Sequence, residues 1–158
     1  MLEHPFEPVF NADSTLLILG TFPSVKSRED HFYYAHPRNR FWPLMAALFN
    51  EPLPHDTLEK KTLLLKHRIA VWDVVQRCEI VGSSDAHITQ ACGVDLLPLL
   101  KQSRIQKIYA NGAKACQLYQ KLCEAKTGRA ITSLPSTSPA NAAYSFERLL
   151  DAWSILRD

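Results

Sequence analysis

Short apolar runs alternate along this chain with longer segments in which apolar residues recur every three or four positions. Each run has the length of a β-strand, and the first three are rich in Ile, Leu and Val on both faces, as buried parallel strands are. The pattern predicts strands over residues 16–19, 69–75, 105–110 and 130–134. It predicts helices over residues 41–49, 58–66, 96–101, 113–125 and about 141–157.

Strands that alternate with helices predict an α/β fold in three layers (α/β/α), with a four-stranded parallel sheet between helices on both faces. No internal repeat, low-complexity stretch or linker interrupts the alternation. We therefore expect residues 1–158 to form a single domain. In such a sheet, ligands bind beyond the carboxyl ends of the strands, so a site is expected in the segments that follow them.

Composition is typical of a globular protein. Of the 158 residues, 46% are apolar and 22% charged, which argues against a disordered chain. The four cysteines form no C-x-x-C pair and no zinc-finger spacing with histidine, so we expect no metal and a reduced, cytoplasmic protein. No apolar run approaches the roughly 20 residues that span a membrane, so no membrane partner is expected.

The net charge of +2 conceals a basic segment. Residues 101–129 carry seven Lys and Arg side chains against a single Glu. Such a segment suits a phosphate backbone, but a solvated helix face rich in Lys has the same composition. Charge alone leaves both interpretations open.

The first strand is followed by Gly20-Thr21-Phe22-Pro23-Ser24. A glycine at such a turn lets a ligand approach the backbone, and the ring of Phe22 offers a flat face for stacking. The segment has neither the G-x-x-x-x-G-K-S/T pattern of a phosphate-binding loop nor the G-x-G-x-x-G pattern of dinucleotide folds. On these residues alone, a plain strand-to-loop turn is an equally good interpretation.

Residues 33–42 read Tyr-Tyr-Ala-His-Pro-Arg-Asn-Arg-Phe-Trp. Pro37 disfavours helix at His36, so Asn39 should lie at or near the start of the next helix, where Asn often serves as a cap. Aromatic rings interleaved with arginines also suit an extruded base and its flanking phosphates. Spacing alone favours capping by Asn39 and a core position for Trp42.

The last strand is followed by Ser136, Thr137, Ser138, Pro139, Ala140 and Asn141. Their hydroxyl and backbone N–H groups suit phosphate oxygens, and the prolines stiffen the loop, although an ordinary Ser/Thr-capped helix entry has the same composition. The sequence contains no G-x-S-x-G or H-E-x-x-H motif and no carboxylate pair flanking the aromatic segment. These residues by themselves leave the reaction open.

Together the three segments resemble the uracil-DNA glycosylase superfamily, and most closely its hypoxanthine-DNA (deoxyinosine) glycosylase branch. The resemblance rests on residues 20–24, 33–42 and 134–141, with Trp72-Asp73 and Ala110-Asn111-Gly112 in the matching order between them. It covers most of the chain. It implies a four-stranded parallel sheet between helices, and an enzyme that flips a deaminated base out of DNA and hydrolyses its N-glycosidic bond without a cofactor.

The resemblance also implies residue roles. Many members place a carboxylate or amide directly before the Pro of the first segment to position water, but Phe22 stands there in this chain and is expected to stack on the base. In the hypoxanthine branch the catalytic role falls to the Asn that matches Asn39, whose neutral amide can accept a hydrogen bond from water. The implied base-binding residues are Gly20, Thr21, Phe22, Pro23, Ser24, Tyr34 and, as a reader of a base N–H, Asp73. The implied DNA-binding residues are Arg38, Arg40, Asn111, Ser136, Thr137, Ser138, Pro139, Ala140 and Asn141.

The expected partner is DNA that contains hypoxanthine, uracil or xanthine, bound by a monomer that initiates base excision repair. Because Lys26 is the only lysine in or beside the three segments, we expect a monofunctional enzyme. Two alternatives stay open. A DNA-damage or nucleic-acid binding module could have kept the fold and lost the reaction, and a hydrolase could act on free nucleosides, although such enzymes usually use carboxylate clusters or a metal.

Overall fold

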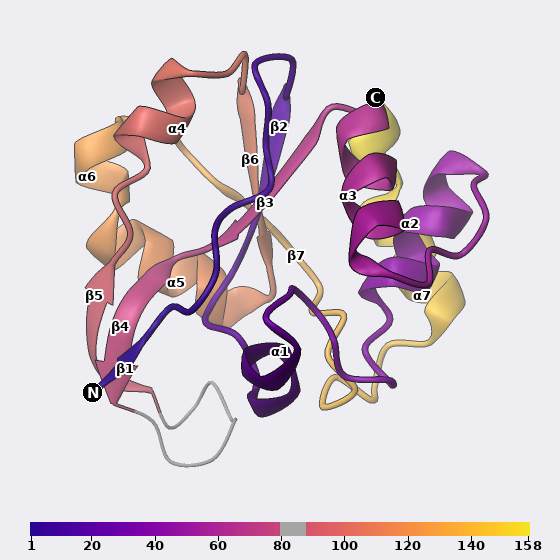
Figure 1. Ribbon diagram of the computed structural model, residues 1–158, viewed down its shortest axis with the longest axis horizontal. Coiled ribbons are helices and arrows are strands. Elements are labelled where there is room, and N and C mark those ends of the chain that lie inside the picture. Colours follow the sequence, from indigo (N-terminus) through magenta and orange to yellow (C-terminus); the bar gives the residue numbers. More distant parts are fainter. Residues whose placement is uncertain (80–87) are drawn as a thin grey trace.

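The computed structural model describes residues 1–79 and 88–158 of the chain. At its centre lies a sheet of four parallel strands in the order β3-β2-β6-β7 (Figure 1). The strands are β2 (Leu16–Gly20), β3 (Ile69–Asp73), β6 (Lys107–Asn111) and β7 (Thr132–Leu134). All four predicted strands are confirmed, with ends that differ from the prediction by one or two residues.

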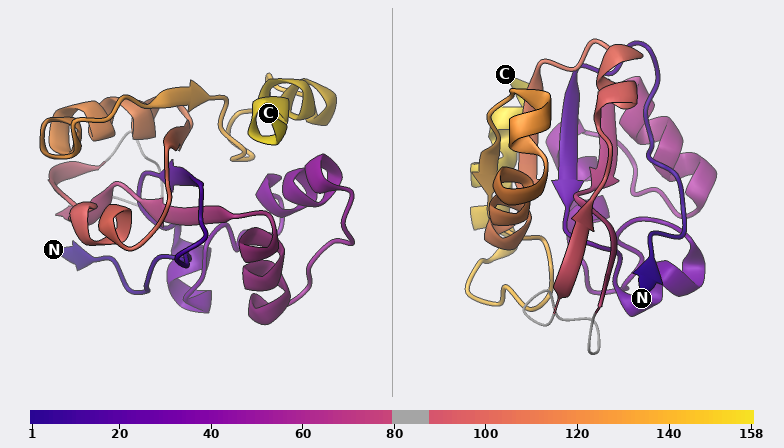
Figure 2. Two further views of the ribbon diagram at one scale, coloured as in Figure 1. Left: turned by 90° about the horizontal axis from the view of Figure 1, so that it is seen from above. Right: turned by 90° about the vertical axis from the view of Figure 1, so that its left-hand side faces the viewer.

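Helices cover both faces of this sheet, as the alternating pattern predicts (Figures 1 and 2). Leu16 and Ile18 of β2 belong to one apolar core, and Leu17 and Leu19 belong to the other, because successive strand residues point to opposite faces. The first core is built with α2 (Phe41–Phe49), α3 (Thr57–Lys66), α7 (Phe146–Trp153) and the 3₁₀ helix η2 (Ser154–Arg157). The second is built with α4 (Leu97–Lys101) and α5 (Ala113–Leu122).

A second, antiparallel sheet in the order β1-β4-β5 was not predicted from the pattern. It consists of β1 (Leu2–Glu3), β4 (Val75–Glu79) and β5 (Thr89–Gly93), and it lies beside α5 on the left of Figure 1. The apolar run 69–75 therefore ends one strand at Asp73 and begins the next at Val75. Pairing with β4 carries the N-terminal segment to the end of β3, where the His4 backbone N–H donates to the Gln76 carbonyl at 2.7 Å.

Two predicted helices differ from the structure. The helix expected over 113–125 is divided at Cys123 into α5 and α6 (Glu124–Thr127). The helix expected from about residue 141 begins only at Phe146, where the Ser145 hydroxyl accepts the Arg148 N–H as an N-cap. Residues before it form a loop because distant groups bind their carbonyls, as described below. Among the described residues, no helix is both long and apolar enough to cross a membrane.

Candidate functional site

A cavity of about 960 Å³ opens at the carboxyl end of the parallel sheet. It is lined by the last residue of every parallel strand: Gly20, Asp73, Asn111 and Leu134. This is the position expected for a ligand site in an open α/β sheet. The volume falls in the range of pockets that bind small molecules.

Most of the site residues expected from the sequence line this cavity; Arg38 and Arg40 are the exceptions. Segments far apart in the chain thus converge on one place. The cavity also has lining residues that the sequence reasoning missed: Ser27, Tyr33, His36, Ala113, Ser133, Leu134, Pro135 and Tyr144. Four of these, Tyr33, His36, Leu134 and Pro135, lie inside the quoted segments but were given no role. The other four lie within three residues of a quoted segment, so extending each segment slightly would have found them.

Asn39, Thr137 and Asn111 form a chain of hydrogen bonds in the cavity wall. The Thr137 backbone N–H donates to Asn111 Oδ1 at 3.0 Å, and Asn111 Nδ2 donates to Thr137 Oγ1 at 3.0 Å. The Thr137 hydroxyl then donates to Asn39 Oδ1 at 2.8 Å. Thr137 is fully buried and Asn111 is 8% exposed. Both were predicted to contact DNA; the structure places them together beneath the cavity surface, and direct contact with DNA stays a prediction.

The amide oxygen of Asn39 has a second donor. The Phe41 backbone N–H, in the first turn of α2, donates to Asn39 Oδ1 at 3.0 Å. A carbonyl oxygen has two lone pairs, and here both accept a hydrogen bond. Asn39 therefore organises the start of α2, as spacing suggested, and also lines the cavity. The polar atom of its side chain that remains for a ligand is Nδ2, a donor and not the expected acceptor.

The two arginines beside Asn39 have different surroundings. Arg38 is exposed. The Arg40 guanidinium donates to the carbonyls of Ser138 and Asn141, each at 3.0 Å, and also to the Tyr144 carbonyl. Arg40 thereby holds residues 138–144 in a loop, which is why the last helix starts late. Contact of either arginine with a DNA phosphate stays a prediction.

The loop after β7 is also held from within. The Asn141 amide donates to the Ser136 carbonyl at 3.0 Å, and Ser136 Oγ accepts the Ser138 N–H at 3.1 Å. Ser138 Oγ accepts the N–H of Ala140, which is exposed. These internal bonds brace the loop, and contact of its tip with DNA stays a prediction.

The first segment is tied to α1 (Val25–Asp30) and to the aromatic segment. The Ser24 hydroxyl accepts the Ser27 N–H at 3.2 Å as the N-cap of α1. The Ser27 hydroxyl accepts the Ala35 N–H at 3.1 Å, which joins the first two segments. Thr21 is 5% exposed, and its hydroxyl has no hydrogen-bond partner among residues 1–79 and 88–158. Buried hydroxyls are normally paired, so this one is an exception in the wall of the cavity.

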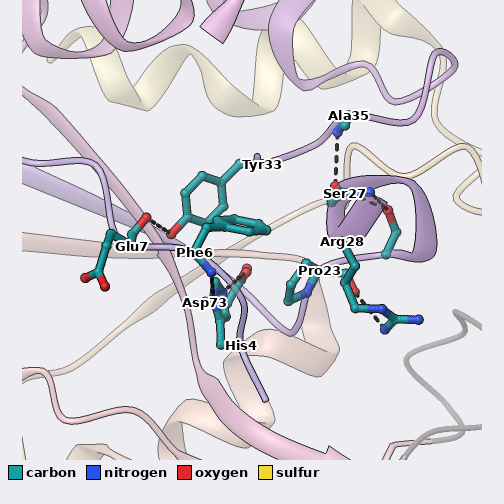
Figure 3. A network of polar contacts seen from close by, with 10 residues as sticks. His4, Phe6, Glu7, Pro23, Ser27, Arg28, Tyr33, Ala35 and Asp73 are labelled. Carbon is teal, nitrogen blue, oxygen red and sulfur yellow. Dashed lines mark hydrogen bonds and ion pairs between the residues drawn. The ribbon is translucent and has the colours of Figure 1, made fainter. Parts of the chain in front are cut away.

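Asp73 ends β3 with its side chain almost fully buried. Its Oδ2 lies 2.8 Å from Nε2 of His4, and the two side chains are 5% and 1% exposed (Figure 3). His4 was not among the predicted residues, because no spacing signal links residue 4 to residue 73. Tyr33 packs nearby and donates to the Glu7 carbonyl at 2.8 Å. Burial, and secondarily the charge of Asp73, raises the pKa of the Tyr33 phenol, so Tyr33 remains a neutral donor.

Phe22 and Tyr34 supply aromatic surface to the cavity. Phe22 is 7% exposed, and its ring meets that of His4 edge to face with centroids 5.9 Å apart. Tyr34 adopts a positive φ of 53° and stacks on Phe41 with centroids 4.1 Å apart. The predicted stacking of Phe22 on a base stays a prediction.

The charged side chains of the basic segment 101–129 lie away from the cavity, although Asn111 and Ala113 of the same segment line it. None of its Lys and Arg side chains lines the cavity, and Lys107 begins β6 at the opposite end of the sheet. The Arg129 guanidinium donates to the Ile105 carbonyl, also before β6. Within the described part of the chain, no group of three or more His, Cys, Asp or Glu side chains is arranged to hold a metal ion.

Comparison with known proteins agrees with this fold and site. Residues 7–157 match the family model of the uracil DNA glycosylase superfamily, and the chain belongs to that superfamily. It is similar to two curated proteins described as hypoxanthine DNA glycosylase. One, from Methanosarcina acetivorans, is 35% identical over 99% of both chains, and the other, from Methanosarcina barkeri, is 30% identical over 89% of both.

The fold is similar to a solution NMR structure of a Methanosarcina acetivorans protein described as a uracil DNA glycosylase. That structure gives a TM-score of 0.81 and 28% identity, with full coverage of both chains. The superfamily and the fold class predicted from the sequence are therefore confirmed.

Proposed function

We propose that this protein is a monofunctional DNA-deoxyinosine glycosylase. It flips a deaminated base, hypoxanthine foremost, out of DNA into the cavity and hydrolyses the N-glycosidic bond, which initiates base excision repair. One observation carries the proposal: residues 20–24, Asn39 and residues 136–141, distant in the chain, meet around one cavity at the carboxyl end of the sheet. Membership of the superfamily and the names of the two relatives support it.

In the reaction, the oxygen of water forms a bond to C1′ of the sugar while the bond from C1′ to the base breaks. The electron pair of that bond leaves with the base; the water oxygen gives up one proton to solvent, and the base takes up one, so the products are the C1′ hydroxyl and the neutral base. Because Asn39 Oδ1 is occupied by Phe41 and Thr137, the amide Nδ2–H donates to one lone pair of the water oxygen and leaves the other for C1′. Placement of a weak nucleophile against an oxocarbenium-like sugar supplies much of the acceleration.

The base is read beside the end of β2. Asp73 offers a carboxylate oxygen to a base N–H, and Thr21 forms part of the wall beside it. Gly20 keeps the wall between them free of a side chain. The loop 136–141 presses on the DNA strand and holds the base out, at an unstacking cost of a few kcal/mol that is lowest for mispaired lesions.

The test is a panel of duplex oligonucleotides that carry hypoxanthine, uracil, xanthine or adenine at one position. Base release is read as alkali-labile strand breaks under single-turnover conditions. Hypoxanthine release is expected, and Asn39→Ala should slow it roughly 100-fold. Asn11→Ala is the matched control, because that Asn caps a turn before β2, away from the cavity, and it should keep the wild-type rate.

Other outcomes would overturn the proposal. Wild-type protein that binds inosine DNA tightly but releases no base would instead be a damage-binding module. Release of hypoxanthine from the free nucleoside but not from the oligonucleotide would make it a nucleoside hydrolase. An Asn39→Ala variant with the wild-type rate would remove Asn39 from the mechanism.

A further inference from the structure

His4 lies directly behind the proposed base reader. Asp73 lines the cavity, whereas His4 does not, yet the His4 Nε2 and Asp73 Oδ2 atoms are 2.8 Å apart with both side chains buried. Figure 3 shows this contact and the N-terminal segment that supplies it. Pairing of β1 with β4 delivers the segment, so the position of His4 is set by backbone bonds and not by chance packing.

The surroundings of His4 Nδ1 show which atom donates in the hydrogen bond between His4 Nε2 and Asp73 Oδ2. His4 Nδ1 lies 3.5 Å from the Phe6 backbone N, which can only donate, so Nδ1 is the acceptor. Nε2 then carries the hydrogen and donates it to Asp73 Oδ2. The His4 ring is held on its sides by Phe6 and Phe22, with centroids 4.8 and 5.9 Å away. One oxygen of the carboxylate is thus bound on the side that faces away from the cavity.

The second oxygen of Asp73 lies against Gly20. A Cβ placed on Gly20 would be 2.4 Å from Asp73 Oδ1, so only a glycine leaves room for this oxygen. Gly20 and Asp73 are neighbours in the parallel pairing of β2 with β3, and both line the cavity. Oδ1 therefore lies on the Gly20 side of the carboxylate, where the hydroxyl of the cavity-lining Tyr34 would also be 3.0 Å from such a Cβ.

We propose that His4 is a positioning residue, which holds the Asp73 carboxylate so that Oδ1 meets the ring N–H of a flipped base. This inference rests on the proposed function and names its substrate class. Hypoxanthine and xanthine carry a hydrogen at N1 and uracil carries one at N3, whereas adenine N1 and cytosine N3 are bare acceptors. A carboxylate oxygen accepts only, so it favours hypoxanthine over adenine and uracil over cytosine; guanine, the parent of xanthine, also carries a hydrogen at N1, so this contact does not separate those two.

The test separates recognition from cleavage. Duplexes with 2′-fluoro-2′-deoxyinosine or 2′-fluoro-2′-deoxyadenosine serve as probes, because the fluorine destabilises an oxocarbenium-like sugar and blocks cleavage. The ratio of the two dissociation constants, measured by fluorescence anisotropy, gives the base selectivity. Deoxyinosine duplexes give the cleavage rate in parallel, and thermal melting reports on folding.

Base selectivity and cleavage are compared among three variants, two at His4 and one at His67. His4→Phe keeps a ring against Phe6 and Phe22 but loses the N–H, and it should lower both selectivity and cleavage roughly 10- to 100-fold, as loss of a supporting hydrogen bond does at other sites. His4→Gln restores an N–H donor near the Nε2 position and should recover most of both. His67→Phe is the matched control, since it removes a His–carboxylate pair of the same kind, with Glu51 at 3.1 Å, outside the cavity.

Asp73→Asn gives a second, opposite test. The His4 N–H would bind the amide oxygen of the new Asn and turn its NH₂ group toward the cavity. A donor at that point should favour the adenine probe, so the selectivity ratio should invert. In the double variant with His4→Phe the amide is no longer held, and the inversion should disappear.

The outcomes distinguish this inference from the proposed function. Wild-type selectivity and cleavage in His4→Phe would overturn the role of His4 and leave the glycosylase intact. Equal losses in His4→Phe and His4→Gln, in step with a lower melting temperature, would also overturn it, since His4 would then be structural only. A wild-type protein that cleaves nothing would overturn the proposed function, while the uncleavable probes would still decide whether His4 sets base selectivity.

Discussion

The hydroxyl of Thr137 donates a hydrogen bond to the amide oxygen of Asn39 across 98 positions of sequence. The same hydroxyl accepts from Asn111 at the end of β6, so three residues from three segments share one network. The network determines which end of the Asn39 amide faces the cavity. The side chain of Asn39, which lies just before α2, therefore has a defined orientation.

Thr137→Val should uncouple this network. Valine keeps the shape of threonine, but Asn111 Nδ2 loses its acceptor and Asn39 Oδ1 loses a donor, so we expect a loss of about 1–3 kcal/mol in the free energy of unfolding. Base release from deoxyinosine DNA should fall as well, because only the Phe41 N–H then holds the Asn39 amide. Thr137→Ser keeps the hydroxyl and should stay close to wild type in both urea unfolding and single-turnover assays. Equal activity in the two variants would contradict the role of the hydroxyl.

Asn39→Asp tests whether Asn39 acts as a donor. Aspartate retains an oxygen for Phe41 and Thr137, but it presents a second oxygen where Nδ2 stood. If the amide N–H holds the water, the rate should fall about as far as in Asn39→Ala, roughly 100-fold. Single-turnover rates on one deoxyinosine duplex give the comparison. An aspartate variant as fast as wild type, or faster, would mean that an acceptor activates the water and that the donor role is wrong.

Gly20→Ala should damage the site more than the fold. The added methyl group would collide with Asp73 Oδ1 and displace the carboxylate that His4 holds. We expect a loss of base selectivity and of cleavage. Gly128→Ala is the comparison: its Cβ meets nothing within 4 Å, but its φ of +66° strains alanine by about 1 kcal/mol. That variant should melt at a lower temperature and cleave at the wild-type rate, and a Gly20→Ala enzyme with unchanged selectivity would contradict the expected collision.

Arg38 and Arg40 should behave differently although they are two positions apart. Exposed Arg38 is the one available to a phosphate, so Arg38→Ala should weaken DNA binding on all sequences and reduce the slope of log K against log salt by about one. Arg40→Ala should lower stability by about 1–3 kcal/mol, because three loop carbonyls lose their donor. DNA-binding titrations at several salt concentrations measure the salt slope of each variant, and melting curves measure its stability. A large change of salt slope in Arg40→Ala alone would show that Arg40, and not Arg38, contacts the phosphates.

Borohydride should trap no covalent adduct with deoxyinosine DNA. A lyase mechanism needs an amine at C1′, and no lysine lines the cavity among the described residues. Lys26, the lysine beside the first segment, is half-exposed on α1 and pairs with Asp30 at 3.3 Å. A trapped band on a denaturing gel, lost in Lys26→Ala, would show that the enzyme is not monofunctional.

The hydrophobic pattern was sufficient to predict the parallel sheet and the helices that cover it. Strands such as β2 are buried on both faces, and a run of four or five apolar residues carries that signal. The small antiparallel sheet left no such signal, because β5 is only partly buried and β1 has two residues. The late start of α7 was missed for a different reason: the decisive bonds come from Arg40, about 100 residues earlier.

By itself the sequence determined the class of fold, the end of the sheet where the site lies, and the three segments that surround it. These follow from local periodicity and from motifs, which are written in neighbouring residues. Only the tertiary structure decided how the polar atoms are used: Asn39 Oδ1 is occupied, Arg40 clamps a loop, and His4 binds Asp73. Hydrogen bonds between residues distant in the chain depend on where the backbone brings them, and no short stretch of sequence records that.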